Sequence, residues 1–156
     1  MDCAFRLPDS AQLRRASLDL EPLPRAPLSG GAAEAVEDWA VAVRKAFLGG
    51  MNYLNEKRFS ESWALLDVWR QIRGAGRRIV CVPDAAAVLH PPLPPVAERE
   101  ELAADAVAGA ASYLAKYEGF FASLLFRIQC FFAALFSFRL SLAWNILQGR
   151  RLDPTQ

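Results

Sequence analysis

The 156-residue chain has few of the residues that usually build a metal centre or a disulfide framework. It contains a single histidine, and its three cysteines (Cys3, Cys81 and Cys130) are far apart and form no CxxC pair. This spacing favours buried, reduced thiols over disulfides or a zinc site. The formal net charge is only +1, so the composition excludes nucleic-acid binding driven by a basic surface.

Several common motifs are also missing. The sequence has no GxGxxG fingerprint, no Walker segment and no nucleophile elbow, which excludes the enzyme classes that depend on them. No apolar run near Met1 resembles a signal peptide, so we expect a cytoplasmic protein. The length suits one domain, and 53% of the residues are hydrophobic.

The most informative stretch is 59–83, FSESWALLDVWRQIRGAGRRIVCVP. Its tryptophans and leucines recur at helical spacing, and Gly74 and Gly76 suit the end of a helix. The run 79–82 is mostly β-branched and stops at Pro83, as a short buried strand would. A helix followed this closely by an apolar strand predicts an α/β unit.

The order of motifs around this stretch resembles the acceptor-side portion of family 2 glycosyltransferases of the GT-A fold. The matching pieces are Gly49-Gly50, Asn55-Glu56, Asp67-Val68, the segment 73–79, Val82-Pro83-Asp84 and His90. The resemblance implies a partial GT-A-like sheet-and-helix unit at 36–95. In the segment 1–35 four prolines (Pro8, Pro22, Pro24 and Pro27) predict a mostly extended lead-in, with a strand or short helix possible at 11–20. The resemblance also implies that the donor-binding half with its Asp-x-Asp motif is missing, so that the chain is inactive alone.

The resemblance suggests where a catalytic base would lie. Inverting sugar transfer needs a carboxylate that takes the proton of the acceptor hydroxyl. Ala64 and Leu65 occupy the positions of the family's acidic pair, so Asp67 or Glu61 would have to substitute. The alternative for Asp67 is a salt-bridged helix residue close to Arg70.

The same resemblance assigns substrate and metal contacts. Trp63 would stack on a sugar ring and Arg70 would contact substrate, although Trp63 is equally well explained as a core residue. His90 would complete a Mg or Mn site only if the donor half joined it, since one histidine cannot hold a metal alone. We therefore expect no cofactor for this chain by itself.

The remainder, 96–149, is predicted to be helical, with a basic tail at 150–156. Its segment 119–147 is so apolar that we expect a long helix or helical hairpin, interrupted only by Arg127 and Arg139. One interpretation is an in-plane membrane helix whose arginines reach lipid headgroups; the other is burial against the α/β unit or a partner. The predicted membrane-contacting residues are Arg127, Phe131, Phe132, Arg139 and Trp144.

Three hypotheses follow, the last of which is a soluble α-rich domain with a buried C-terminal hairpin. The first is a partial or degenerate glycosyltransferase that needs a donor-binding polypeptide. The second is a non-catalytic module that docks on a partner protein or peripherally on the inner face of the membrane.

Overall fold

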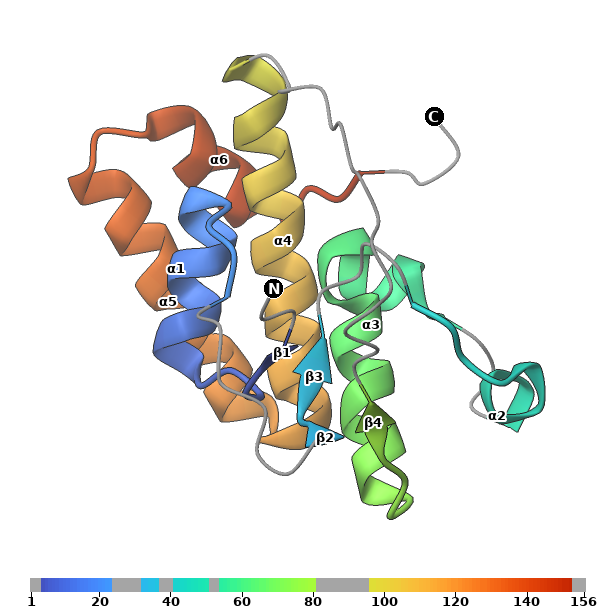
Figure 1. Cartoon of the computed structure of the whole chain (residues 1–156). Coiled ribbons are helices and arrows are strands. Elements are labelled where there is room, and N and C mark those ends of the chain that lie inside the picture. The colour runs from blue at the N-terminus through green and yellow to red at the C-terminus, as the bar shows by residue number, and fades with distance from the viewer. Residues whose placement is uncertain (1–3, 24–31, 37–40, 51–53, 81–95, 153–156) are drawn as a thin grey trace.

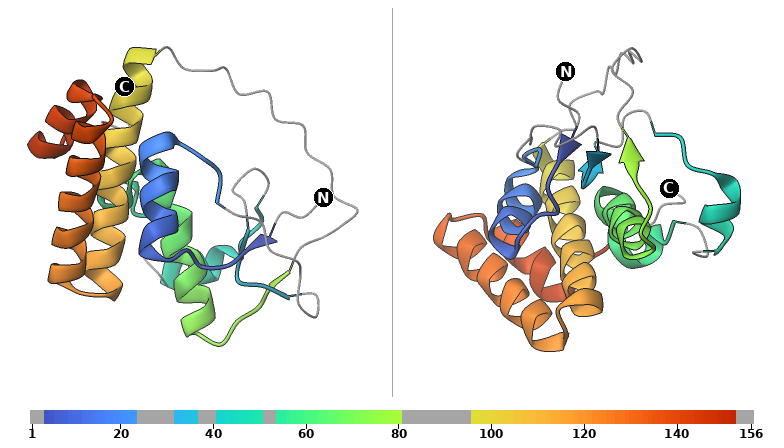
Figure 2. Two further views of the ribbon diagram at one scale, coloured as in Figure 1. Left: turned by 90° about the vertical axis from the view of Figure 1, so that its left-hand side faces the viewer. Right: turned by 60° about the horizontal axis from the view of Figure 1, so that its bottom comes forward.

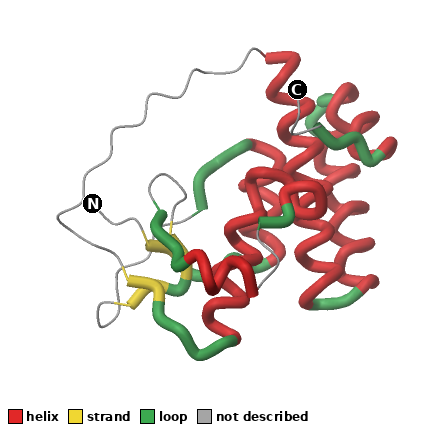
Figure 3. The backbone as a smooth tube through the Cα atoms, turned by 90° about the vertical axis from the view of Figure 1, so that its right-hand side faces the viewer, coloured by secondary structure: helices red, strands yellow, loops and turns green. Residues whose placement is uncertain are grey.

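The computed structural model describes residues 4–23, 32–36, 41–50, 54–80 and 96–152. Helices dominate these residues, and the strands are two residues long each (Figures 1 and 3). In chain order the elements are β1 (Ala4–Phe5), α1 (Ser10–Asp19), β2 (Ala32–Ala33), β3 (Ala35–Val36), α2 (Lys45–Gly50), α3 (Glu56–Gly74), β4 (Ile79–Val80), α4 (Val96–Tyr117), α5 (Phe120–Phe136) and α6 (Leu140–Gln148).

Helix α4 is the centre of the fold and packs against α1, α3, α5 and α6 (Figure 1). Small residues make this possible, because a helix that presents alanine and glycine lets neighbouring backbones approach closely. Its buried alanines include Ala103, Ala104, Ala110 and Ala111. At Gly109 the approach is closest, since a Cβ there would collide with the Phe59 carbonyl of α3.

Helix α3 confirms the helix and turn predicted from the sequence. The Asn55 side chain caps its first turn by accepting from the Arg58 N–H at 3.1 Å. The helix is kinked at Ser60, whose φ of 60° is unusual for a residue with a side chain. It ends at Gly74, and Gly76 takes the left-handed backbone (φ 66°) that glycine adopts without strain.

The predicted α/β fold is wrong. Among the described residues β1 pairs only with β3 and β2 only with β4, both antiparallel, so no GT-A-like sheet covers α3. The apolar face of α3 is buried mainly against α4 instead. The β-branched run at 79–82 misled the prediction: Ile79 is buried, but Val80 is 64% exposed at the end of a two-residue pair.

The segment 1–35, predicted to be a mostly extended lead-in with a strand or short helix possible at 11–20, contributes a core helix, α1. Asp9 and Gln12 form a reciprocal capping box at the start of α1, with hydrogen bonds of 2.7 and 3.0 Å. Leu13 of α1 is fully buried, and the helix packs against α4 and α5. The four prolines that suggested an extended chain all lie outside the helix.

The apolar segment 119–147 does not form one long helix. It divides into α5 and α6 at Ser137–Arg139, where Phe138 has a left-handed φ of 56°. Helix α6 then packs on both α4 and α5. Tertiary packing therefore breaks a run whose composition alone shows no stop.

Candidate functional site

The predicted base, Asp67, lies in a hydrogen-bonded cluster between α3 and α4. Its Oδ1 accepts from Lys116 Nζ at 2.7 Å and from the Tyr117 hydroxyl at 2.6 Å. Its Oδ2 accepts from Gln71 Nε2 at 2.7 Å. The side chain of Asp67 is only 7% exposed. We call these four residues the Asp67 cluster.

Arg70 adds a second layer to this cluster. Its guanidinium lies 4.3 Å from the centre of the Tyr117 ring and donates to the Tyr113 hydroxyl at 3.1 Å. Burial raises the pKa of Tyr117, and its hydrogen bond to Asp67 raises that pKa further. Burial also raises the pKa of Tyr113, against the opposing effect of Arg70. Both phenols are thus held in the protonated form, in which Tyr117 donates to Asp67 and Tyr113 accepts from Arg70.

This geometry connects two helices rather than presenting a base to a substrate. A general base needs an oxygen within hydrogen-bond reach of the proton it removes, but both oxygens of Asp67 face protein donors. Its catalytic role stays a prediction that the geometry does not favour. The side chain of Glu61 and all of His90 lie outside the described residues.

Trp63 and Arg70, the predicted substrate contacts, both face the protein. Trp63 is 6% exposed, and its indole N–H donates to the Ala106 carbonyl of α4 at 2.7 Å. This satisfies the only polar group of the indole, as burial requires. Arg70 is occupied by Tyr113 and Tyr117. Neither side chain is arranged to receive a sugar.

The two arginines predicted to reach lipid headgroups turn inward. Arg127 donates to the Ile146 carbonyl of α6 at 3.2 Å. Arg139 pairs with Glu100 (3.0 Å) and Asp19 (3.3 Å) and also donates to the Leu18 carbonyl at 2.8 Å. Arg139 therefore joins the start of α6 to α4 and α1.

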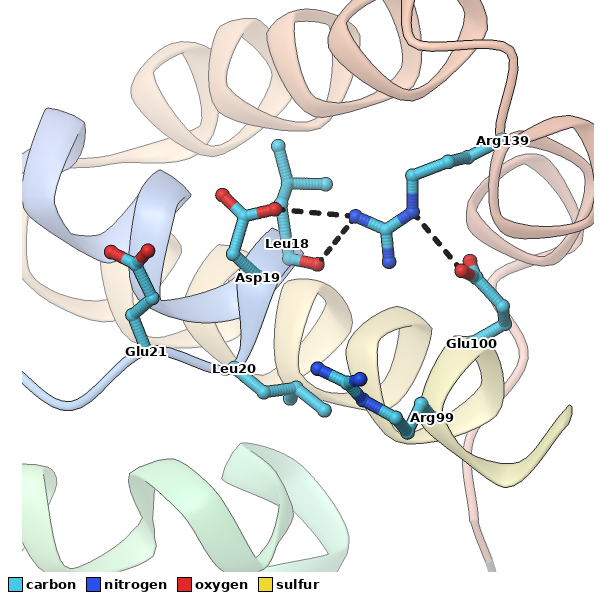
Figure 4. Close-up of a pocket in the computed structure, with 7 residues that line it drawn as sticks. All are labelled: Leu18, Asp19, Leu20, Glu21, Arg99, Glu100 and Arg139. Atoms are coloured by element: carbon cyan, nitrogen blue, oxygen red, sulfur yellow. Dashed lines mark hydrogen bonds and ion pairs between the residues drawn. The ribbon is translucent and has the colours of Figure 1, made fainter. Parts of the chain in front are cut away.

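Arg139 also lines a cavity of about 380 Å³ between these elements (Figure 4). The wall carries charges of both signs, from Arg99, Arg139, Asp19, Glu21 and Glu100. The second oxygen of Glu100 is buried without a hydrogen-bond partner among the described residues. Because two arginines and three carboxylates share the wall, their charges largely offset one another and do not select an anion or a cation.

One face of α5 is apolar and exposed. In the two views of Figure 2 this helix runs along an edge of the molecule. At about 100° per residue its exposed apolar side chains lie within an arc of about 160°, opposite the buried Phe126, Cys130 and Ala134. We call this the outer face of α5, and it consists of Phe120, Phe121, Leu124, Leu125, Ile128, Phe132 and Phe136.

The exposure of this face is high for a globular domain. Phe121 is 79% exposed and Phe136 is 77% exposed. Of the remaining residues predicted to contact a membrane, Phe132 (46%) belongs to this face, Phe131 is half-buried and Trp144 on α6 is 60% exposed. Single exposed apolar residues need no explanation, but a contiguous apolar face marks an interaction site.

No helix in the described part of the chain has the length and hydropathy needed to cross a bilayer. Within those same ranges, no three histidine, cysteine, aspartate or glutamate side chains group as metal ligands would.

The sequence analysis identified the apolar segment but did not predict which of its side chains are exposed. It named Phe131 and Phe132 without separating the inner side of the helix from the outer. The signal that was present is the spacing of Phe121, Leu125, Ile128 and Phe132, which advance by four, three and four residues. That repeat is typical of a helix that packs against another helix.

Comparisons with family models, with curated proteins and with solved structures found no match to this chain.

Proposed function

We propose that this protein is a helical docking module that binds a partner protein through the outer face of α5. The observation that carries the proposal is the set of seven large apolar side chains left exposed on one helix. Such a face is removed from water most simply by the apolar surface of another protein.

A protein partner fits this face better than a membrane surface does. Helices that lie in a membrane interface combine an apolar face with basic residues that reach headgroups. The only charged residue of α5 is Arg127, and it is bonded to α6. Arg139 and Arg150 pair with carboxylates of the same chain. These three arginines are thus bonded to groups of the same chain, which leaves them less available to an anionic membrane.

Photo-crosslinking in the native host tests the proposal. A photoreactive phenylalanine analogue at Phe121 should crosslink a defined protein band, which mass spectrometry identifies. The same analogue at Leu54, which is 40% exposed just before α3, is the matched control and should give no such band. Helix α3 and helix α5 lie on different sides of α4 (Figure 1).

A vesicle assay supplies the opposing outcome. Flotation of the full chain with phosphatidylcholine and phosphatidylglycerol vesicles, lost in L125E, would show that the face meets lipid and would refute a protein partner. Absence of any crosslink at Phe121 would refute docking through this face.

The glycosyltransferase hypothesis stays a prediction from the sequence, and no described contact favours it. It requires a second polypeptide that supplies donor binding. Calorimetric titration with a nucleotide sugar, with and without such a polypeptide, is the test specific to it.

A further inference from the structure

We infer that the partner of the outer face of α5 is a second copy of this chain, with the two α5 helices antiparallel. This inference rests on the proposed docking function and names its occupant. Three properties of the face support it: its area, its residue spacing and its lack of charge.

The area matches what a stable dimer needs. With roughly 200 Å² for each fully exposed large side chain, the exposed fractions give on the order of 800 Å² of apolar surface. The largest apolar patch of an ordinary monomer is about 300–600 Å², whereas each partner of a standard interface contributes about 800 Å². Pairing the face with itself would bury a comparable area on both chains.

The spacing of the central residues is the same in both directions. Phe121, Leu125, Ile128 and Phe132 are separated by four, three and four residues. An antiparallel pair therefore forms four layers, with Phe121 of one chain against Phe132 of the other, and Leu125 against Ile128. A two-fold axis repeats each contact, as in an isologous dimer. We call these four residues the seam.

The charge pattern permits the face to meet itself. Arg127 is the sole charged residue of α5 and points toward α6, so pairing brings no like charges together. Antiparallel helices also set their dipoles in opposite directions, which is favourable. A face that lacks charge is compatible with its own copy, since its complement is another uncharged apolar surface.

Single substitutions in the seam test the pairing. We expect the full-length wild-type chain to sediment as a dimer at about 10 µM, and L125E or I128K to weaken association by roughly 100-fold, because each buries an unpaired charge twice. Leu125 is 58% and Ile128 is 42% exposed, so the monomeric variants should keep the circular dichroism spectrum of a folded chain. L54E is the matched control and should remain a dimer.

Mixing the two variants tests the antiparallel register. In an L125E–I128K pair one layer regains the native Leu125–Ile128 contact, and the other brings the new carboxylate next to the new ammonium group. An equimolar mixture should therefore recover the dimer that neither variant forms alone. A mixture that stays monomeric overturns the antiparallel pairing.

A wild-type chain that is monomeric across the concentration range overturns self-association altogether. That result leaves the proposed function standing if Phe121 still crosslinks a different protein. The loss of all crosslinks would remove both.

Discussion

Replacing Asp67 by alanine should destabilise the protein by about 3 kcal/mol, because the side chain ties α3 to α4. The D67A change leaves three donors without their acceptor: Tyr117, Lys116 and Gln71. A hydrogen bond to a buried charged group contributes about 1.5–3 kcal/mol.

The three lost hydrogen bonds do not contribute equally to the change in stability. The side chain of Lys116 is 31% exposed, so its ammonium can turn to water and its share falls to roughly 0–1 kcal/mol. Gln71 is half-buried and at the edge of the cluster. The Tyr117 hydroxyl, at 2.6 Å from the carboxylate, carries most of the effect.

Urea unfolding followed by circular dichroism measures this change. The midpoint should fall while the m-value stays constant, and the melting temperature should drop by roughly 6–12 °C for a chain of this size. D67N should be intermediate, since its amide oxygen can still accept one of the hydrogen bonds. D19A removes a carboxylate that is 55% exposed and should cost under about 1 kcal/mol.

A double-mutant cycle isolates the main contact. In the D67A background, Y117F should cost much less than it does in the wild type, because the hydroxyl has already lost its acceptor. If D67A is within about 0.5 kcal/mol of the wild type, the cluster is not a structural tie. The carboxylate would then again be a candidate for the catalytic role that the sequence suggested.

Three further predictions concern packing, pH and the α6 junction. G109A should destabilise the protein by about 1–3 kcal/mol, because the new Cβ meets the Phe59 carbonyl. G74A is the control, since a Cβ at Gly74 has open space around it. Equal melting temperatures of the two variants would contradict this prediction. Burial raises the pKa of the Cys130 thiol from 9.0 to about 12, so the folded state binds this proton more tightly than the unfolded state. The stabilisation from this thiol is complete below pH 9 and falls above it by up to about 1.4 kcal/mol per pH unit. Urea midpoints should therefore decline less steeply between pH 9 and 10 in C130A than in the wild type. An equally steep decline in both proteins would refute the raised pKa of Cys130. R139A should lower the urea midpoint by the equivalent of about 2 kcal/mol, because two carboxylates and a carbonyl lose their shared donor. R139K should be intermediate. A midpoint for R139A within error of the wild type would show that the junction between α5 and α6 holds without the Arg139 side chain.

The capping box of Asp9 and Gln12 at the start of α1 was not recognised from the sequence. Local signals predicted helix ends better where glycines are present. The turn after α3 is one example, because Gly76 can take a left-handed backbone at little cost. The C-terminal apolar segment was correctly identified as helical for the same kind of reason, namely composition and spacing. The alternative interpretation of Asp67 was a salt-bridged helix residue close to Arg70, but its salt bridge is with Lys116. Lys116 and Tyr117, its main partners, lie about fifty positions away and gave no local sign.

The fold class could not be inferred from the segment 59–83 alone. Its four-residue β-branched run is compatible with a buried strand or with the end of a short exposed pair, and periodicity does not distinguish them. The choice depended on α4, since its small side chains let α3 pack directly on a helix. Motif order then suggested a sheet that the described residues do not contain.

The sequence by itself determined the helical periods, the stop after α3 and the surplus of apolar residues near the C-terminus, because these depend on backbone preferences and composition within a few residues. Only the tertiary structure decided which apolar face is buried and which is left exposed. In the folded chain Arg127 and Arg139 face inward, the apolar segment is divided into α5 and α6 at Phe138, and Phe121 is exposed. Those outcomes depend on contacts between residues distant in the chain, which no local pattern encodes.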